Sequence, residues 1–146
     1  MMKPAALLQH IFYPRTDTPE AAARAMRNGG VAGWIMVAVH FLLGAVLIIL
    51  IVPEQSTISG DALIPATIQL FLALLYGALG TYSWRGSRTA AWSLLLLLVL
   101  DTLLLLARVP ELGAQFAVHL AAIILAVGAV RGAIADRRLA RAGIAQ

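Results

Sequence analysis

The chain has 146 residues, of which 61% are hydrophobic and 12% are charged, and its formal net charge is +4. Soluble domains average about 45–50% apolar and about 25% charged residues. A chain of this composition cannot cover its apolar residues from water, which excludes an ordinary water-soluble domain. The chain also has no cysteine, which excludes disulfides, thiolate metal sites and cysteine nucleophiles.

The N-terminal segment 1–29 precedes the long apolar part of the chain, and we expect it to be cytoplasmic or interfacial. An apolar patch at 7–12 is interrupted by polar residues, so it is too broken for a signal-peptide core. We expect this patch either to lie at the headgroup level of the membrane or to be disordered. Residues 16–30 are predicted to form a short helix, with Thr18 as its N-cap and Gly29 and Gly30 as its stop.

Four apolar blocks follow, each close to the ~20 residues that cross a ~30 Å hydrocarbon layer as a helix. They cover about 30–52, 63–83, 90–107 and 114–133. The polar stretches between them are too short to fold as separate units. The sequence therefore predicts an all-α fold, an integral membrane four-helix bundle at 30–134, followed by a basic cytoplasmic tail at 135–146.

The basic residues indicate how the spans are oriented. Ten of the eleven lie before the first span, between the second and third, or after the fourth, namely Lys3, Arg15, Arg24, Arg27, Arg85, Arg88, Arg131, Arg137, Arg138 and Arg141. Cytoplasmic segments of membrane proteins accumulate Lys and Arg, so both termini are predicted to be cytoplasmic. The alanine- and arginine-rich composition is typical of a bacterium with GC-rich DNA, which makes the inner membrane the expected location.

Polar residues inside the apolar blocks are costly in lipid and are the candidate site residues. At a helical rise of ~1.5 Å per residue, Asp101, His119 and Gln69 fall about 10 Å beneath the outer boundary and can share one layer. His40 and Tyr76 fall lower and are predicted to form a second polar layer.

Small residues on a helix face let two membrane helices approach closely. The glycines expected to serve this packing are Gly33, Gly44, Gly80, Gly128 and Gly132. Gly128 and Gly132 lie opposite the alanine stripe of the fourth span, so they are expected to contact another subunit or protein.

Several readings of the polar residues remain open. Asp101 and His119 can form a buried contact that fixes helix register, or an ion path that passes protons or cations. A metal site lacks a complete ligand set, since Asp101, His119 and Gln69 alone do not suffice for zinc. A haem held by His40 and His119 would require strong helix tilt, because their estimated depths differ. We therefore predict no metal and no cofactor.

Catalytic signatures are missing from the sequence. It has no G-x-S-x-G, H-E-x-x-H, P-loop or G-x-G-x-x-G motif, and its loops are short. We therefore expect no catalytic residues and no enzymatic activity. The basic residues are explained by membrane orientation, so no nucleic-acid partner is expected.

Two segments, residues 80–88 and 130–133, resemble stretches of uncharacterised small bacterial four-transmembrane-helix proteins, a likeness that implies no activity. In span number and loop length the chain is also similar to the small multidrug transporter family. That family has an essential glutamate in its first span, where this chain has His40.

The sequence thus favours an accessory, assembly or interaction subunit of a membrane complex, because short loops suit a protein whose partners are other membrane proteins. The expected partners are the lipid bilayer and either a membrane protein or further copies of this chain. The alternative is a small oligomeric proton- or cation-coupled transporter or channel that uses Asp101 and His119.

Overall fold

A computed structural model describes residues 14, 16–51, 60–108 and 113–143. The apolar patch at 7–12 lies outside them. The described chain forms four helices: α2 (Pro19–Ile51), α3 (Gly60–Trp84), α4 (Arg88–Arg108) and α5 (Ala114–Arg141). Each is long and apolar enough to cross a membrane. The prediction of an all-α protein with four spans is confirmed.

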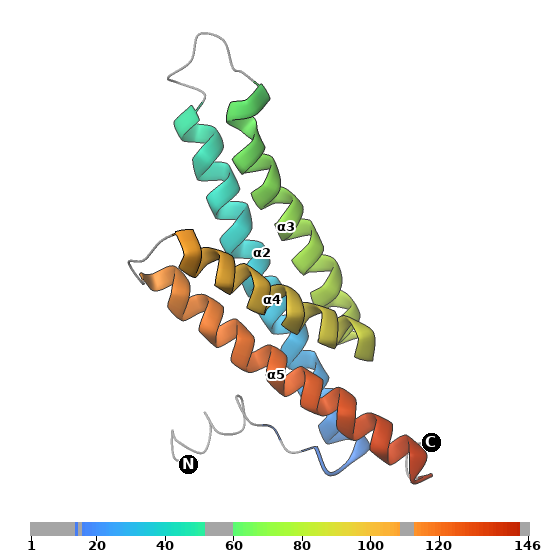
Figure 1. The fold of residues 1–146 in the computed structure, drawn as a ribbon. Helices are drawn as coiled ribbons and strands as arrows, with labels where there is room; N and C mark the ends of the chain where they lie inside the picture. The colour runs from blue at the N-terminus through green and yellow to red at the C-terminus, as the bar shows by residue number, and fades with distance from the viewer. Residues whose placement is uncertain (1–13, 15, 52–59, 109–112, 144–146) are drawn as a thin grey trace, which may run out of the picture.

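The helices are arranged as two antiparallel pairs. In Figure 1, α2 and α3 run side by side, and α4 and α5 cross them as a second pair over the lower half of α2. Helix α2 packs against all three other helices, and α4 also contacts α3 and α5. The two pairs are inclined to each other, so residues at one level of the bundle lie at different distances from their own helix ends.

Helix α2 begins as predicted but does not stop where predicted. The Ala21 amide donates to Thr18 Oγ1 at 3.2 Å, which is the expected N-cap. The helix then continues through Gly29 and Gly30 to Ile51. These glycines do not end the helix but allow a close approach, since a Cβ on Gly30 would lie 2.9 Å from Trp84 Cβ. The separate short helix at 16–30 was a wrong prediction.

Helix α5 extends beyond the fourth apolar block to Arg141, so part of the predicted tail is helical. The second half of α5 packs against the first turns of α2. A Cβ on Gly132 would lie 2.6 Å from the Ala22 carbonyl oxygen and 2.9 Å from Ala25 Cβ. A Cβ on Gly128 would lie 3.6 Å from Asn28 Nδ2. Both glycines are buried within the chain, so the expectation that they face another subunit was wrong.

The remaining packing glycines bring α2 and α3 together. A Cβ on Gly80 would lie 3.0 Å from the Gly33 Cα, and a Cβ on Gly33 would lie 2.8 Å from the Tyr76 carbonyl oxygen. Gly44 faces Leu70 in the same interface. Close backbone approach at these positions is the packing that small residues permit between membrane helices.

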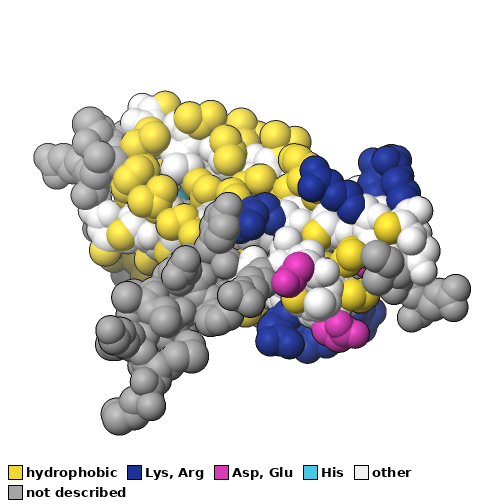
Figure 2. Space-filling view, turned by 90° about the horizontal axis from the view of Figure 1, so that it is seen from below, with side chains coloured by type: hydrophobic (Ala, Val, Ile, Leu, Met, Phe, Trp, Pro, Cys, Tyr) yellow, Lys and Arg dark blue, Asp and Glu magenta, His cyan; other side chains and the backbone are white. Residues whose placement is uncertain are grey.

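Charge and apolar surface are segregated. Figure 2 views the molecule from the end where α2 begins and α5 finishes, and the arginines gather there beside an apolar region. Arg27 lies over the Trp84 ring at 6.0 Å, and Arg88 Nη2 pairs with Asp136 Oδ2 at 2.7 Å. Elsewhere large apolar side chains are exposed, including Leu74 at 75%. A surface of this kind is suited to lipid.

Candidate ion-binding site

Five polar side chains meet inside the bundle, and all four helices contribute to them. They are His40 from α2, Gln69 and Tyr76 from α3, Asp101 from α4 and His119 from α5, and we call them the polar cluster. Asp101 is their centre. Its Oδ2 lies 2.9 Å from His40 Nε2, 3.2 Å from His119 Nε2 and 3.0 Å from the Tyr76 hydroxyl, which donates to it.

The other nitrogen of each imidazole is also held. His40 Nδ1 lies 2.6 Å from Gln69 Oε1, and His119 Nδ1 lies 2.9 Å from the Gln115 carbonyl oxygen. The His40 ring stacks on Tyr76 with 5.1 Å between centroids. Both rings are therefore fixed in position and orientation, with each Nε2 directed at the same carboxylate oxygen.

The polar cluster is enclosed by apolar side chains. His40, Tyr76 and His119 are at most 2% exposed, and the Asp101 side chain is 15% exposed. Tyr76 belongs to the same core as Met36, Leu94, Leu98, Ala122 and other buried residues. In such surroundings a charge is stable only when it is paired and hydrogen-bonded.

When the His119 ring is neutral and Asp101 is ionised, neither His119 Nε2 nor Asp101 Oδ2 carries a hydrogen that could bridge their contact. A backbone carbonyl can only accept, so His119 Nδ1 must carry the hydrogen that reaches Gln115. In the neutral ring Nε2 then has only a lone pair, and an ionised Asp101 offers only lone pairs as well. Two acceptors at 3.2 Å repel each other, so this contact requires a cation between them or an added proton.

With the Gln69 amide oriented as in this structure, its oxygen toward the ring, the same reasoning holds for His40. Gln69 Oε1 accepts from Nδ1, which leaves a lone pair on Nε2 at 2.9 Å from Asp101 Oδ2. Three lone-pair-bearing atoms therefore converge in the bundle interior. The arrangement is suited to binding a proton or a metal cation at the point where they meet.

The sequence predicted part of this arrangement. Asp101 does contact His119, but Gln69 contacts His40 and not Asp101. The structure also brings His40 and Tyr76 to Asp101, so the two predicted polar layers are one. Depths counted from helix ends misplaced His40 because α4 and α5 are inclined to α2 and α3 (Figure 1).

Within the described part of the chain, the residues that can hold a metal are His40, Asp101 and His119, whose ligand atoms all lie within 4.8 Å of one another. The sequence missed this set because it placed His40 in a different layer. A haem between the two histidines does not fit, since Asp101 Oδ2 lies within hydrogen-bond distance of both Nε2 atoms.

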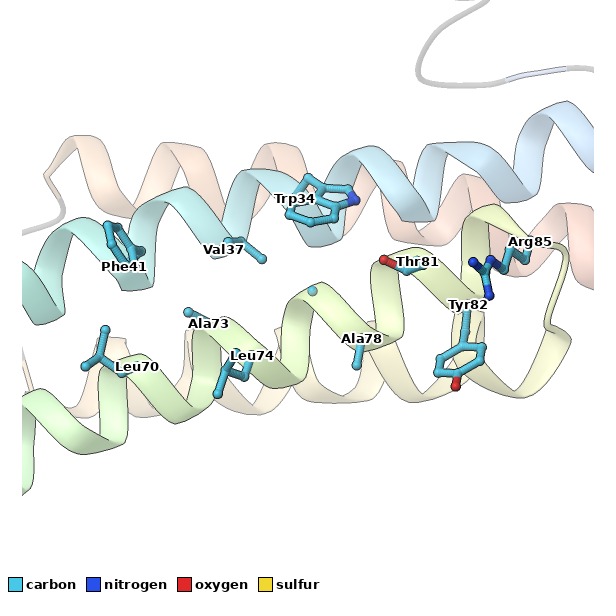
Figure 3. Close-up of a pocket in the computed structure, with 11 residues that line it drawn as sticks. Trp34, Val37, Phe41, Leu70, Ala73, Leu74, Ala78, Thr81, Tyr82 and Arg85 are labelled. Atoms are coloured by element: carbon cyan, nitrogen blue, oxygen red, sulfur yellow. The ribbon is translucent and has the colours of Figure 1, made fainter.

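A separate groove of about 580 Å³ lies on the outer side of α2 and α3. Figure 3 shows Trp34 and Phe41 of α2 above Leu70 and Leu74 of α3, with Arg85 near one end. No residue of the polar cluster is among the described residues that line it. The groove's apolar lining is suited to lipid hydrocarbon, and the groove is separate from the polar cluster.

Comparisons with known proteins assign no family. No protein-family model matches the chain, and no curated protein or solved structure is significantly similar to it. The four long apolar helices are consistent with a small four-span membrane protein, and the chemistry of the polar cluster is the basis for assigning a function.

Proposed function

We propose that this chain is a small membrane transporter or channel subunit that binds a proton or metal cation at Asp101, His40 and His119. The observation that supports this most directly is the convergence of two imidazoles on one carboxylate oxygen inside a lipid-facing bundle. Inserting an Asp at the centre of a membrane helix costs about 2.5–3.5 kcal/mol. An ionisable residue that is so costly to insert into the membrane generally marks an ion or substrate pathway.

The position of the polar cluster suggests the side from which an ion enters. His119 lies five residues after the start of α5, and Asp101 lies seven residues before the end of α4. At ~1.5 Å per residue these distances are only about 8–10 Å along the helices. An ion that enters between the end of α4 and the start of α5 therefore has the shortest path to the polar cluster, and this side carries Arg108 but lies opposite the end where the other described arginines gather.

The orientation is part of the proposal. Apart from Arg108, which ends α4, the described arginines belong to the start of α2, the α3–α4 connection and the last part of α5, which all lie at one end of the bundle. The positive-inside tendency favours that end as the cytoplasmic one. The protein then lies in a bacterial inner membrane with both termini in the cytoplasm, and the ion enters from the outer side.

A flux assay tests this function. The purified full chain is reconstituted in liposomes, and proton and divalent-cation fluxes are followed with encapsulated indicator dyes. We expect a flux that Asp101→Asn abolishes, because the amide lacks the negative charge that pairs with the cation. Asp136→Asn is the matched control, since Asp136 pairs with Arg88 outside the polar cluster and its loss leaves the ion site intact.

The transporter proposal fails if well-folded protein conducts none of these ions, or if Asp101→Asn conducts as well as the unmodified chain. Folding of each variant is checked by circular dichroism and by gel filtration in detergent, so that loss of flux is not confused with loss of structure.

An accessory or interaction subunit is the second candidate. In Figure 1, α4 and α5 cover only part of α2 and α3. The uncovered part carries exposed Val46, Ile49, Leu50, Ile64 and Ile68, which can face a partner as well as lipid. Silent liposomes together with stoichiometric co-purification of another membrane protein would favour this function over transport.

A further inference from the structure

We infer that the polar cluster is a binding site for a divalent transition-metal ion of the zinc class, with His40 Nε2, His119 Nε2 and Asp101 Oδ2 as its ligands. This inference rests on the proposed function, because it names the cation that the same site holds. The sequence predicted no metal here, since Asp101 and His119 without a second imidazole are an incomplete set. The structure supplies His40 as that second imidazole.

The three ligand atoms have the spacing that a metal requires. Zinc forms bonds of about 2.0–2.2 Å to nitrogen and oxygen in a tetrahedral arrangement, which places neighbouring ligand atoms roughly 3.3 Å apart. Here Asp101 Oδ2 lies 2.9 Å and 3.2 Å from the two imidazole nitrogens. All three atoms lie within 4.8 Å of one another. These separations are close to those of a tetrahedral zinc site.

The outer contacts are those of metal-binding histidines. Such residues almost always donate their other ring N–H to a carboxylate or a carbonyl oxygen, which fixes the ring and its tautomer. His40 Nδ1 is held by Gln69 Oε1 and His119 Nδ1 by the Gln115 carbonyl oxygen. The Tyr76 hydroxyl donates to Asp101 Oδ2, so the carboxylate is held as well. Every ligand therefore has a second interaction that orients it.

A single divalent cation compensates the negative charge of Asp101 and accepts the lone pairs of both imidazoles. The two Nε2 atoms and Asp101 Oδ2 all present lone pairs toward one region. Three protein ligands leave one coordination position open for water or a substrate group, as in catalytic and exchangeable zinc sites. An open position also lets an ion leave, which suits transport better than a closed four-ligand site.

The ligand types indicate the class of metal. Mg²⁺ and Ca²⁺ prefer sites made of oxygen atoms, whereas two of these three ligands are imidazole nitrogens. Imidazole with one carboxylate suits Zn²⁺ and Fe²⁺ and related divalent ions of the first transition row. We take Zn²⁺ as the test ion and Co²⁺ as its spectroscopic substitute.

Metal binding is tested on the full chain in detergent after treatment with a chelator. Isothermal titration with Zn²⁺ is expected to give one ion per chain, and X-ray absorption of the zinc-loaded protein is expected to give nitrogen and oxygen ligands at about 2.0–2.2 Å with an imidazole signature. Co²⁺ is expected to give visible bands of a four-coordinate ion. X-ray absorption needs no variant, so it tests the assignment even where a substitution unfolds the protein.

Variants then identify the ligands. His40→Ala, His119→Ala and Asp101→Asn are each expected to weaken Zn²⁺ binding more than tenfold, and Gln69→Ala is expected to weaken it by about 10–100-fold through loss of the outer hydrogen bond. Asp136→Asn is the control and is expected to bind Zn²⁺ like the unmodified chain, because Asp136 lies at the arginine end.

The inference is overturned if the folded chain binds no stoichiometric Zn²⁺, or if binding survives loss of both imidazoles. Its failure differs from that of the proposed function. If proton flux depends on Asp101 but the chain binds no zinc, the metal-site inference is rejected and the transporter proposal stands. If the chain binds one zinc but transports no ion, the metal-site inference stands and the transporter proposal is rejected.

Discussion

A single oxygen atom, Asp101 Oδ2, connects the four helices. It accepts a hydrogen bond from the Tyr76 hydroxyl of α3 and lies 2.9 Å and 3.2 Å from the Nε2 atoms of His40 in α2 and His119 in α5. Removing this acceptor affects three partners at once, whereas removing one imidazole affects only one contact to the carboxylate. The two changes should therefore differ in their cost to stability.

We expect Asp101→Leu to lower the free energy of unfolding by about 1–3 kcal/mol, the cost of leaving a buried polar group such as the Tyr76 hydroxyl without its acceptor. His119→Leu should cost less, because Asp101 keeps His40 and Tyr76. The measurement is reversible unfolding in mixed micelles, followed by circular dichroism. Equal and negligible costs would contradict the central role of Asp101, and Asp136→Leu reports the effect of removing a partly exposed carboxylate outside the polar cluster.

For individual residues, the sequence predicted the contact between Asp101 and His119 but not the five-residue polar cluster. Asp101 and His119 are polar residues in otherwise apolar helices, and both lie close to the connection between α4 and α5, so counting residues brought them to one level. His40 was misplaced because it belongs to the other helix pair, whose inclination cannot be read from one helix alone. Its hydrogen bond to Gln69 likewise depends on a three-dimensional contact that has no signature in the sequence.

Among the helices, the contact between the first turns of α2 and the last turns of α5 depends on Gly132. A side chain at this position collides with backbone atoms, since its Cβ would lie 2.6 Å from the Ala22 carbonyl oxygen and 2.9 Å from the Met26 amide nitrogen. Backbone atoms cannot rotate away as the end of a flexible side chain can. The helices must separate to admit any larger residue.

We expect Gly132→Leu to destabilise the isolated chain by about 1–3 kcal/mol or more, as overpacking of a close interface does. Ala140→Leu, at an exposed position near the end of α5, should have little effect. The midpoint of thermal unfolding in detergent measures both changes. If Gly132→Leu altered only the mass of an oligomer and left this midpoint unchanged, the glycine would face a second chain and not α2.

Helix ends were the weakest part of the sequence interpretation. Gly29 and Gly30 are typical of a helix stop, yet both lie within α2 because their lack of a side chain allows α3 and α5 to approach. The sequence cannot distinguish a glycine that ends a helix from one that permits close packing without knowing what lies beside it. Thr18 was correctly predicted because an N-cap depends on local hydrogen bonding.

For the whole molecule, the four spans could be predicted because lipid requires long apolar helices, and this requirement is visible in composition alone. The pairing of α2 with α3 and of α4 with α5 could not. Leucine is favourable both toward lipid and toward another helix, so the apolar surface of α4 does not indicate which of its residues face a neighbour. Only the small and polar residues indicate which face of a helix meets a neighbouring helix.

The orientation of the bundle decides from which side of the membrane the proposed ion site is reached. Because the chain has no cysteine, single-cysteine variants report accessibility without interference. We expect Gln55→Cys, between α2 and α3, to react with a membrane-impermeant maleimide in intact bacterial cells whose outer membrane has been made permeable. Asp17→Cys and Thr89→Cys should react only after the inner membrane is also opened, since both residues lie at the arginine end. The reverse pattern would place the arginine end outside. The shortest path to Asp101 and His119 would then begin in the cytoplasm, and the protein would be suited to export of its ion and not to uptake.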